Sequence, residues 1–320
     1  MTLPLLTIGI PVYNSEKIIK KRLENILSQS FQDFNLIIYD NSTDSTPILC
    51  KEFASRNKRI TYIHEIKKNG IEFAFNYLLQ KANTKYFVWA ADDDVWDSYF
   101  LEKNMNILET QDDIVGSIGQ VKKYNLLTED FLLTPTDSFF KKNYKKIRKR
   151  FRHFGHVSIY ANSHEKRAGK FLRTNEELSI YAIFRTKELQ VSQAIIINDK
   201  NKKWAIGINP YKKTILNILK YGNFNVLNEV LWWWSSEHYV STNVILQYKD
   251  GSFPLKGLLF PYYEYSFWCM KNLGIKFFLK NIDYFIISDL FYRLITAYNF
   301  IYSLLNISTK NRICSDLNTN

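Results

Sequence analysis

The stretch LTIGIPVYNSEKIIKKRLENILSQSFQDFNLIIYDNSTDST, residues 6–46, decides the fold. It begins with a short apolar run, residues 6–11, which stops at a proline as a buried strand does. Residues 16–29 then place apolar side chains at helical spacing, and residues 34–39 form a second apolar run. A polar loop rich in turn and cap residues begins at Asp40. The stretch therefore predicts a strand, a helix and a second strand in succession.

The same alternation continues through the first hundred residues. Residues 47–55 and 71–81 are predicted helices, and residues 60–64 and 86–91 are predicted strands. Strands that alternate with helices predict an α/β protein with a doubly wound, mostly parallel sheet. Ligands of such sheets bind beyond the carboxyl ends of the strands. We therefore expect the binding site in the loops that follow the predicted strands.

Polar residues gather at three of these strand ends, at residues 11–14, 40–46 and 92–94. Three consecutive aspartates form the last cluster. Like charges repel one another, and burial favours the neutral form of a carboxyl group. A hard divalent cation such as Mg²⁺ or Mn²⁺ removes both penalties, and it is usually held by one or two carboxylates together with substrate phosphates. The cluster therefore predicts a metal–diphosphate site, and a solvated acidic turn is the alternative.

Four motifs in this region resemble the nucleotide-sugar-binding half of family 2 glycosyltransferases. They are residues 7–14, 26–34, 40–44 and 92–96, and they occur in the family's order and approximate spacing. The resemblance is close over roughly residues 5–125 and weakens afterwards. It implies a GT-A fold and a glycosyltransferase of the hexosyltransferase type. Such an enzyme moves a sugar from a UDP-, GDP- or dTDP-sugar to a glycan or lipid-linked acceptor, with Mg²⁺ or Mn²⁺ and with inversion.

The resemblance also implies roles for individual residues. The donor nucleotide is assigned to Pro11, Tyr13, Asn14, Asp40, Asn69, Asp92 and Asp93. Asp40 would accept a hydrogen bond from the base, and a helix cap or Asx turn is its alternative role. The metal is assigned to Asp94, with Asp92 and His238 as further candidates. An ordinary packed histidine is the alternative for His238.

The catalytic base is the least defined part of this site. Inverting members carry an aspartate at the start of a helix that here corresponds to residues 212–221, yet residues 209–211 include no carboxylate. Asp199 is the first candidate, because it follows the apolar run 195–197 and would lie at a strand end. A plain turn residue is its alternative role. The other acidic residues nearby are Glu176, Glu177 and Glu188.

Composition and charge suggest where the protein works. The chain has 320 residues, a net charge of +12 and three scattered cysteines, and no charged-then-apolar leader precedes the first strand, so we expect a cytoplasmic protein. We expect a glycosyltransferase domain at residues 1–250, made of a donor half, 1–125, and an acceptor half, 126–250. Residues 251–320 are expected to form a helical extension that associates with membranes.

Two segments carry the membrane prediction. Eight of the twelve residues 141–152 are Lys or Arg, which suits an anionic membrane surface, although a solvated helix face is the alternative. Residues 253–307 are rich in aromatic and aliphatic side chains. Their best apolar stretch, 284–305, is interrupted by charged residues, so an interfacial helix on the inner face of the cell membrane is favoured over a spanning one. A helical pair packed on the catalytic domain is the alternative.

Two other functions remain open. A basic α/β protein rich in aromatic residues could bind nucleic acid, but the acidic cluster would repel phosphates unless a metal is bound, and we expect no nucleic-acid partner. The absent carboxylate near residue 210 also permits a degenerate homologue that binds donor without turnover.

Overall fold

The computed structural model describes residues 3–66, 70–124, 156–174, 177–197, 210–235, 263–290 and 293–294. The chain divides into two compact units. The larger unit comprises residues 1–199 and 210–235, and the smaller comprises residues 200–209 and 236–320. The two units are described separately below.

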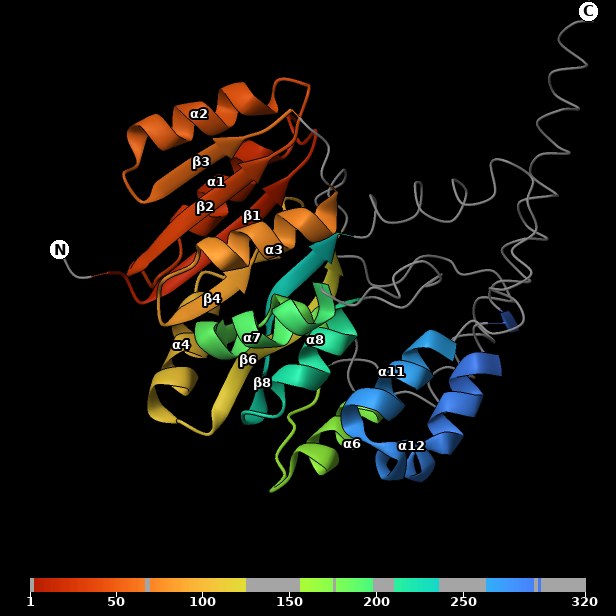
Figure 1. The fold of residues 1–320 in the computed structure, drawn as a ribbon. Coiled ribbons are helices and arrows are strands. Elements are labelled where there is room, and N and C mark those ends of the chain that lie inside the picture. Colours follow the sequence, from red (N-terminus) through yellow and green to blue (C-terminus); the bar gives the residue numbers. More distant parts are fainter. Residues whose placement is uncertain are drawn as a thin grey trace, which may run out of the picture. The chain divides into compact units, whose positions relative to one another are not determined.

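The larger unit is built on one mixed sheet with helices packed against it (Figure 1). Its strand order among the described residues is β3-β2-β1-β4-β7-β6-β8-β5. The strands are β1 (Leu6–Val12), β2 (Phe34–Asp40), β3 (Ile60–His64), β4 (Tyr86–Trp89), β5 (Val95–Trp96), β6 (Ile114–Tyr124), β7 (Ile183–Arg185) and β8 (Asn223–Ser235). The first four strands in this order run parallel, and β7 is antiparallel to both of its neighbours. The predicted α/β class with a mostly parallel sheet is confirmed.

The helices of the larger unit lie close to their predicted positions in the first hundred residues. They are α1 (Ile19–Leu27), α2 (Thr46–Arg56), α3 (Ile71–Lys81), α4 (Phe100–Thr110), α6 (His164–Thr174), α7 (Thr186–Ile197) and α8 (Pro210–Ile218). Helix α1 begins later than the apolar spacing predicts, because the backbone carbonyl of Ser15 first accepts hydrogen bonds from the amides of Ile18 and Ile19 in a turn. The buried face of α1 carries Arg22 among its apolar residues.

Strand register determines which loops meet. Val12 at the end of β1 is paired with Asp40 at the end of β2, and Gly9 is paired with Trp89 at the end of β4. The loops after these three strands therefore leave the sheet at the same edge.

The prediction of a strand at residues 195–197 is wrong. These three isoleucines belong to the last turn of α7, which packs against α8 and α3. A short run of β-branched residues does not by itself distinguish a buried strand from a buried helix. The argument that Asp199 follows a strand therefore no longer holds, and Asp199 itself lies outside the described residues.

The smaller unit includes α11 (Tyr263–Leu273) and α12 (Ile275–Lys280), and a further helical segment continues to residue 290. Aromatic side chains fill the space between these helices, namely Tyr265, Trp268, Phe277, Tyr284 and Phe285. Within the ranges that the structure describes, no helix is both long enough and apolar enough to cross a membrane.

Candidate functional site

The loop after β1 is fastened to the loop after β2. The amide of Asn14 donates to Ser42 Oγ over 2.7 Å, and the amide of Thr43 donates to Asn14 Oδ1 over 2.9 Å. Ser15 adds a third link, since its amide donates to Thr46 Oγ1 over 2.8 Å. Asn14 has φ +51°, a left-handed conformation that asparagine tolerates better than most residues. These contacts fix the two predicted donor loops against each other.

The loop after β4 joins the same edge. Ser15 Oγ donates a hydrogen bond to Asp92, so the acidic cluster touches the loop after β1. Tyr13 is half exposed beside it, whereas Pro11 is buried within β1. The structure thus brings together Tyr13, Asn14, Asp40 and the three aspartates 92–94, which come from three different strand ends.

Asp40 is turned into the protein. Its side chain is fully buried, Oδ1 accepts from the amide of Ser42 over 2.7 Å, and Oδ2 accepts from the Tyr62 hydroxyl over 2.8 Å. Burial, together with the hydrogen bond to Asp40, raises the pKa of Tyr62. The bond to the Ser42 amide is the Asx turn named above as the alternative role. In this geometry Asp40 shapes the loop from within.

Asp94 is anchored to β8. Its side chain is 3% exposed, Oδ2 accepts from Trp232 Nε1 over 2.8 Å, and Oδ1 accepts from the Ser235 amide over 3.2 Å. Burial raises the pKa of Asp94 well above its usual range and neighbouring Asp93 adds to this, while Arg22 and the two hydrogen bonds oppose it. Both carboxylate oxygens of Asp94 are therefore engaged within the protein.

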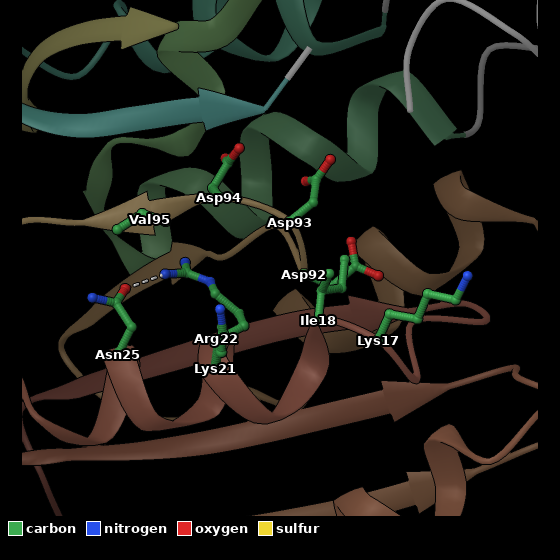
Figure 2. A pocket seen from close by; sticks show the side chains of 9 residues that line it. All are labelled: Lys17, Ile18, Lys21, Arg22, Asn25, Asp92, Asp93, Asp94 and Val95. Atoms are coloured by element: carbon green, nitrogen blue, oxygen red, sulfur yellow. Dashed lines mark hydrogen bonds between the residues drawn. The ribbon is translucent and has the colours of Figure 1, made fainter. Parts of the chain in front are cut away.

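The acidic turn borders a pocket on α1. Figure 2 shows the nine residues that line it: Lys17, Ile18, Lys21, Arg22, Asn25, Asp92, Asp93, Asp94 and Val95. In this view Asp93 and Asp94 extend from the side of the turn that faces away from α1, and Arg22 lies between the turn and the helix. Asp92 and Asp93 are partly exposed, unlike Asp94.

The donor set fits a divalent cation that is shared with a diphosphate. No group of three His, Cys, Asp or Glu side chains that could hold a metal ion occurs within the described part of the chain. Mg²⁺ and Mn²⁺ sites with substrate phosphates need only one or two carboxylates. Asp93 is partly exposed, whereas Asp94 is buried and each of its two oxygens accepts a hydrogen bond. The metal assignment of Asp94 therefore stays a prediction, and the partial exposure of Asp93 makes Asp93 a further candidate ligand.

The remaining predicted residues divide into two groups. Asn69, Glu176, Asp199 and His238 lie outside the described residues. Glu177 begins the 3₁₀ helix Glu177–Tyr181, and Glu188 lies in the first turn of α7.

Sequence reasoning missed four residues that shape the site. Arg22 and Asn25 on α1 hold the acidic turn from below, and Trp232 and Ser235 on β8 hold Asp94. Arg22 left one signal, because it lies three residues after Ile19 and four before Ile26 on the apolar face of α1. The run of three tryptophans at 232–234 was a second signal, since a buried indole N–H needs an acceptor.

The fold and the site together define a mixed α/β protein of the GT-A class whose polar loops converge beyond the ends of parallel strands. The chain belongs to glycosyl transferase family 2, whose family model matches residues 7–167. The family resemblance read from the four motifs is thereby confirmed.

Individual relatives match parts of the chain. The glycosyltransferase GlyA of Streptococcus pneumoniae is 29% identical over 163 residues, which are 50% of this chain and 22% of that protein. The teichuronic acid biosynthesis glycosyltransferase TuaG of Bacillus subtilis is 28% identical over 137 residues, which are 42% of this chain and 52% of that protein. The chain thus spans about half the length of TuaG and less of GlyA.

One solved structure matches nearly the whole chain. The mannosyltransferase PcManGT of Pyrobaculum calidifontis, in complex with GDP-Man and Mn²⁺, has a TM-score of 0.50 and 14% identity. The match covers 98% of this chain and 81% of that one. At this identity the likeness is one of fold.

Proposed function

We propose that this protein is a glycosyltransferase that moves a sugar from a nucleoside-diphosphate-sugar donor to a glycan or lipid-linked acceptor. The observation that carries the proposal is the convergence of three polar loops, after β1, β2 and β4, at one edge of the sheet. Ligands of such sheets bind at this edge. Family membership and a relative that binds GDP-Man support the same reaction class.

The donor is held by the three loops. The partly exposed Tyr13 and the backbone around Asn14 offer a surface for the nucleotide, and the Asx turn at Asp40 keeps the second loop in place beside them. Asp92 and Asp93 face the diphosphate from the third loop. In this proposal, Asp40 shapes the nucleotide site from within the protein, and Asp94 anchors the acidic turn.

The proposed cofactor is Mg²⁺ or Mn²⁺, held by Asp93 with Asp92 beside it. A bound cation stabilises the negative charge that develops on the leaving diphosphate. The Mn²⁺ that accompanies GDP-Man in PcManGT supports this choice. Inversion is proposed on the resemblance alone, and the base that would accept the proton of the acceptor hydroxyl is left unassigned, because the strand-end argument for Asp199 failed.

Binding and turnover of candidate donors test the proposal. A thermal-shift screen with UDP-, GDP- and dTDP-sugars, with and without Mn²⁺, should single out one nucleotide whose stabilisation requires the metal. A ligand at 100 times its Kd stabilises by about 2.7 kcal/mol. Release of the nucleotide from that donor then separates an enzyme from a degenerate homologue that binds without turnover. Absence of any metal-dependent nucleotide response would reject both.

We further propose a peripheral location on an anionic membrane, at its cytoplasmic face. In the smaller unit, α12 and the helical residues after it expose several large aliphatic side chains: Ile275, Leu279, Ile282, Ile286, Ile287, Leu290 and Leu294. Exposed lysines accompany them at 271, 276 and 280. Aliphatic side chains rimmed by lysines match the boundary between acyl chains and anionic headgroups. The buried free thiol of Cys50 suits a reducing compartment.

A further inference from the structure

Helix α1 carries a buried arginine beneath the acidic turn. Arg22 is only 3% exposed, although its neighbours on the same helix face are Ile19, Leu23 and Ile26. Burial lowers the pKa of Arg22 to about 10, and the carboxylates of residues 92–94 act in the opposite direction. A buried guanidinium is costly unless its surroundings compensate for the lost water. The contacts of the Arg22 guanidinium should therefore show what compensates for the cost of its burial.

Two directed hydrogen bonds tie Arg22 to the start of the acidic turn and to its neighbour on the helix. Nε donates to the carbonyl of Ala91 over 2.8 Å, and Nη1 donates to Asn25 Oδ1 over 2.8 Å (Figure 2). The guanidinium also lies over the Trp96 ring, 4.3 Å from its centroid. A single side chain thus contacts the residue before the three aspartates and the aromatic residue that follows them.

Asn25 attaches the other end of the acidic turn, at Trp96, to α1. Its Nδ2 donates to the carbonyl of Trp96 over 2.8 Å, and its Oδ1 accepts from the amide of Trp96 over 2.9 Å. Because the same Oδ1 also accepts from Arg22, the arginine fixes the orientation of the amide that holds Trp96. The three aspartates therefore lie between two residues, Ala91 and Trp96, that hydrogen bonds attach to α1.

Besides its two hydrogen bonds, Arg22 places a positive charge, delocalised over the guanidinium, beside the three carboxylates. Arg22 Nη2 is buried and has no hydrogen-bond partner within the described part of the chain. Asp94 is the carboxylate that interacts most strongly with Arg22, followed by Asp93 and Asp92. A cation in this place offsets the mutual repulsion of the three carboxylates before any ligand arrives.

We propose that Arg22, acting with Asn25, is a positioning residue that clamps the acidic turn at both ends and places a resident positive charge beneath it. What the turn binds rests on the proposed function, whereas the clamp is a property of the protein without ligand. The clamp and the charge have opposite consequences for a bound cation. Loss of a nearby positive charge should strengthen binding of a divalent cation, and loss of the clamp should weaken it.

Hydrogen exchange of the metal-free, full-length protein tests the clamp directly. Arg22→Met removes both the hydrogen bonds and the positive charge of the guanidinium, and Arg22→Lys keeps a positive charge but not the planar guanidinium. Asn25→Ala removes the two hydrogen bonds to Trp96. In all three variants, amides in peptides that cover residues 91–96 should exchange about tenfold faster than in the native protein, because they lose directed hydrogen bonds.

Arg59→Met is the matched control. Arg59 also bonds a neighbouring asparagine and lies over a ring, that of Phe34 at 4.5 Å, but it is on another part of the larger unit. The Arg59→Met variant should leave amide exchange in peptides that cover residues 91–96 unchanged. If Arg22→Met protects these amides as well as the native protein does, or if all peptides exchange faster to the same extent, the clamp is refuted.

Binding of Mn²⁺ alone, followed by the paramagnetic resonance of the free ion, separates the clamp from the charge. Weaker binding, on the order of fivefold, in both Arg22→Met and Arg22→Lys supports positioning. Tighter or unchanged binding by Arg22→Met would show that the clamp does not position the turn for a cation, and would overturn the positioning role. If the native protein itself binds no Mn²⁺, the proposed metal site fails, and the exchange experiment still decides on the clamp.

Discussion

The roles of Asp93 and Asp94 can be separated by substituting each with alanine. In the structure, Asp94 is buried and hydrogen-bonded to β8, and Asp93 is partly exposed, so the proposed function assigns the cation to Asp93. Removal of the Asp94 side chain leaves Trp232 Nε1–H and the Ser235 amide without their acceptor in a buried place. An unsatisfied buried donor costs about 1–3 kcal/mol. Two such donors bring the loss to roughly 2–6 kcal/mol, before any relief is considered.

Two further effects act in opposite directions. The buried Asp94 carboxylate is disfavoured by its loss of water, which is why its pKa is raised, so its removal relieves part of the cost. Arg22, however, loses the carboxylate with which it interacts most strongly. We therefore expect Asp94→Ala to lower the free energy of unfolding by about 2–4 kcal/mol. Asp93→Ala, at a partly exposed position, should change it by less than about 1 kcal/mol.

Urea unfolding gives the stabilities, and Mn²⁺-dependent binding of UDP or GDP gives the ligand role of each residue. Asp93→Ala should lose metal-dependent nucleotide binding while it keeps its stability, and Asp94→Ala should lose stability in the absence of any ligand. Glu24→Gln, an exposed change on α1, is the control for loss of one negative charge. If Asp94→Ala is as stable as the native protein yet cannot bind nucleotide with Mn²⁺, then Asp94 is the ligand and the assignment made from its hydrogen bonds is wrong.

Three further predictions follow from other parts of the structure. Asp40→Ala should weaken nucleotide binding about tenfold in calorimetry, because it removes the carboxylate that accepts from both the Ser42 amide and the Tyr62 hydroxyl. Tyr62→Phe removes only one of these two hydrogen bonds and should have the smaller effect, so equal effects would contradict this order. The triple change of Ile282, Ile286 and Leu290 to serine should reduce co-sedimentation with anionic liposomes at least about tenfold. Ile48→Ser, an exposed change on α2, should leave co-sedimentation unchanged, and equal losses in the two variants would refute a lipid-binding face. Burial lowers the pKa of His164 below 6.5, so the unfolded chain binds the proton at a higher pH than the folded protein does, and stability should fall as the pH drops below about 6.5. In urea titrations, His164→Gln should lose less stability than the native protein between pH 7 and about 5. An unchanged dependence of stability on pH would show that His164 does not cause this fall.

Local patterns were sufficient to predict the strands and helices from β1 to β4. The apolar runs at β1, β2 and β4 and the turn residues after them are set by neighbouring residues in the chain. Once the strands are taken as parallel, the meeting of their loops follows from the topology. This is why the cluster of Asn14, Asp40 and the three aspartates could be expected before the structure was known.

The roles of individual side chains in that cluster depended on residues far away in the sequence. Asp94 meets Trp232 across 138 positions, and no local pattern marks that contact. Asp40 could equally face a ligand or the protein, and the hydroxyl of Tyr62 on β3 determined that it faces inward. For residues 195–197 the sequence was ambiguous, because three isoleucines suit a buried helix as well as a buried strand.

The buried charges of the acidic turn are better explained by geometry than by stability. Taking Asp94 and Arg22 out of water is expensive, and their mutual attraction repays the cost only where hydrogen bonds satisfy the remaining polar atoms. Asp94 has both oxygens bonded, but one nitrogen of Arg22 is left without a partner in the described structure. An apolar pair of the same size would avoid that loss but could not hold Ala91 and Trp96 by directed bonds. If the turn presents Asp92 and Asp93 to a ligand, as the proposed function has it, directed bonds that fix its shape are an advantage. The unsatisfied nitrogen of Arg22 is then a cost that a binding site can carry and a purely hydrophobic core would avoid.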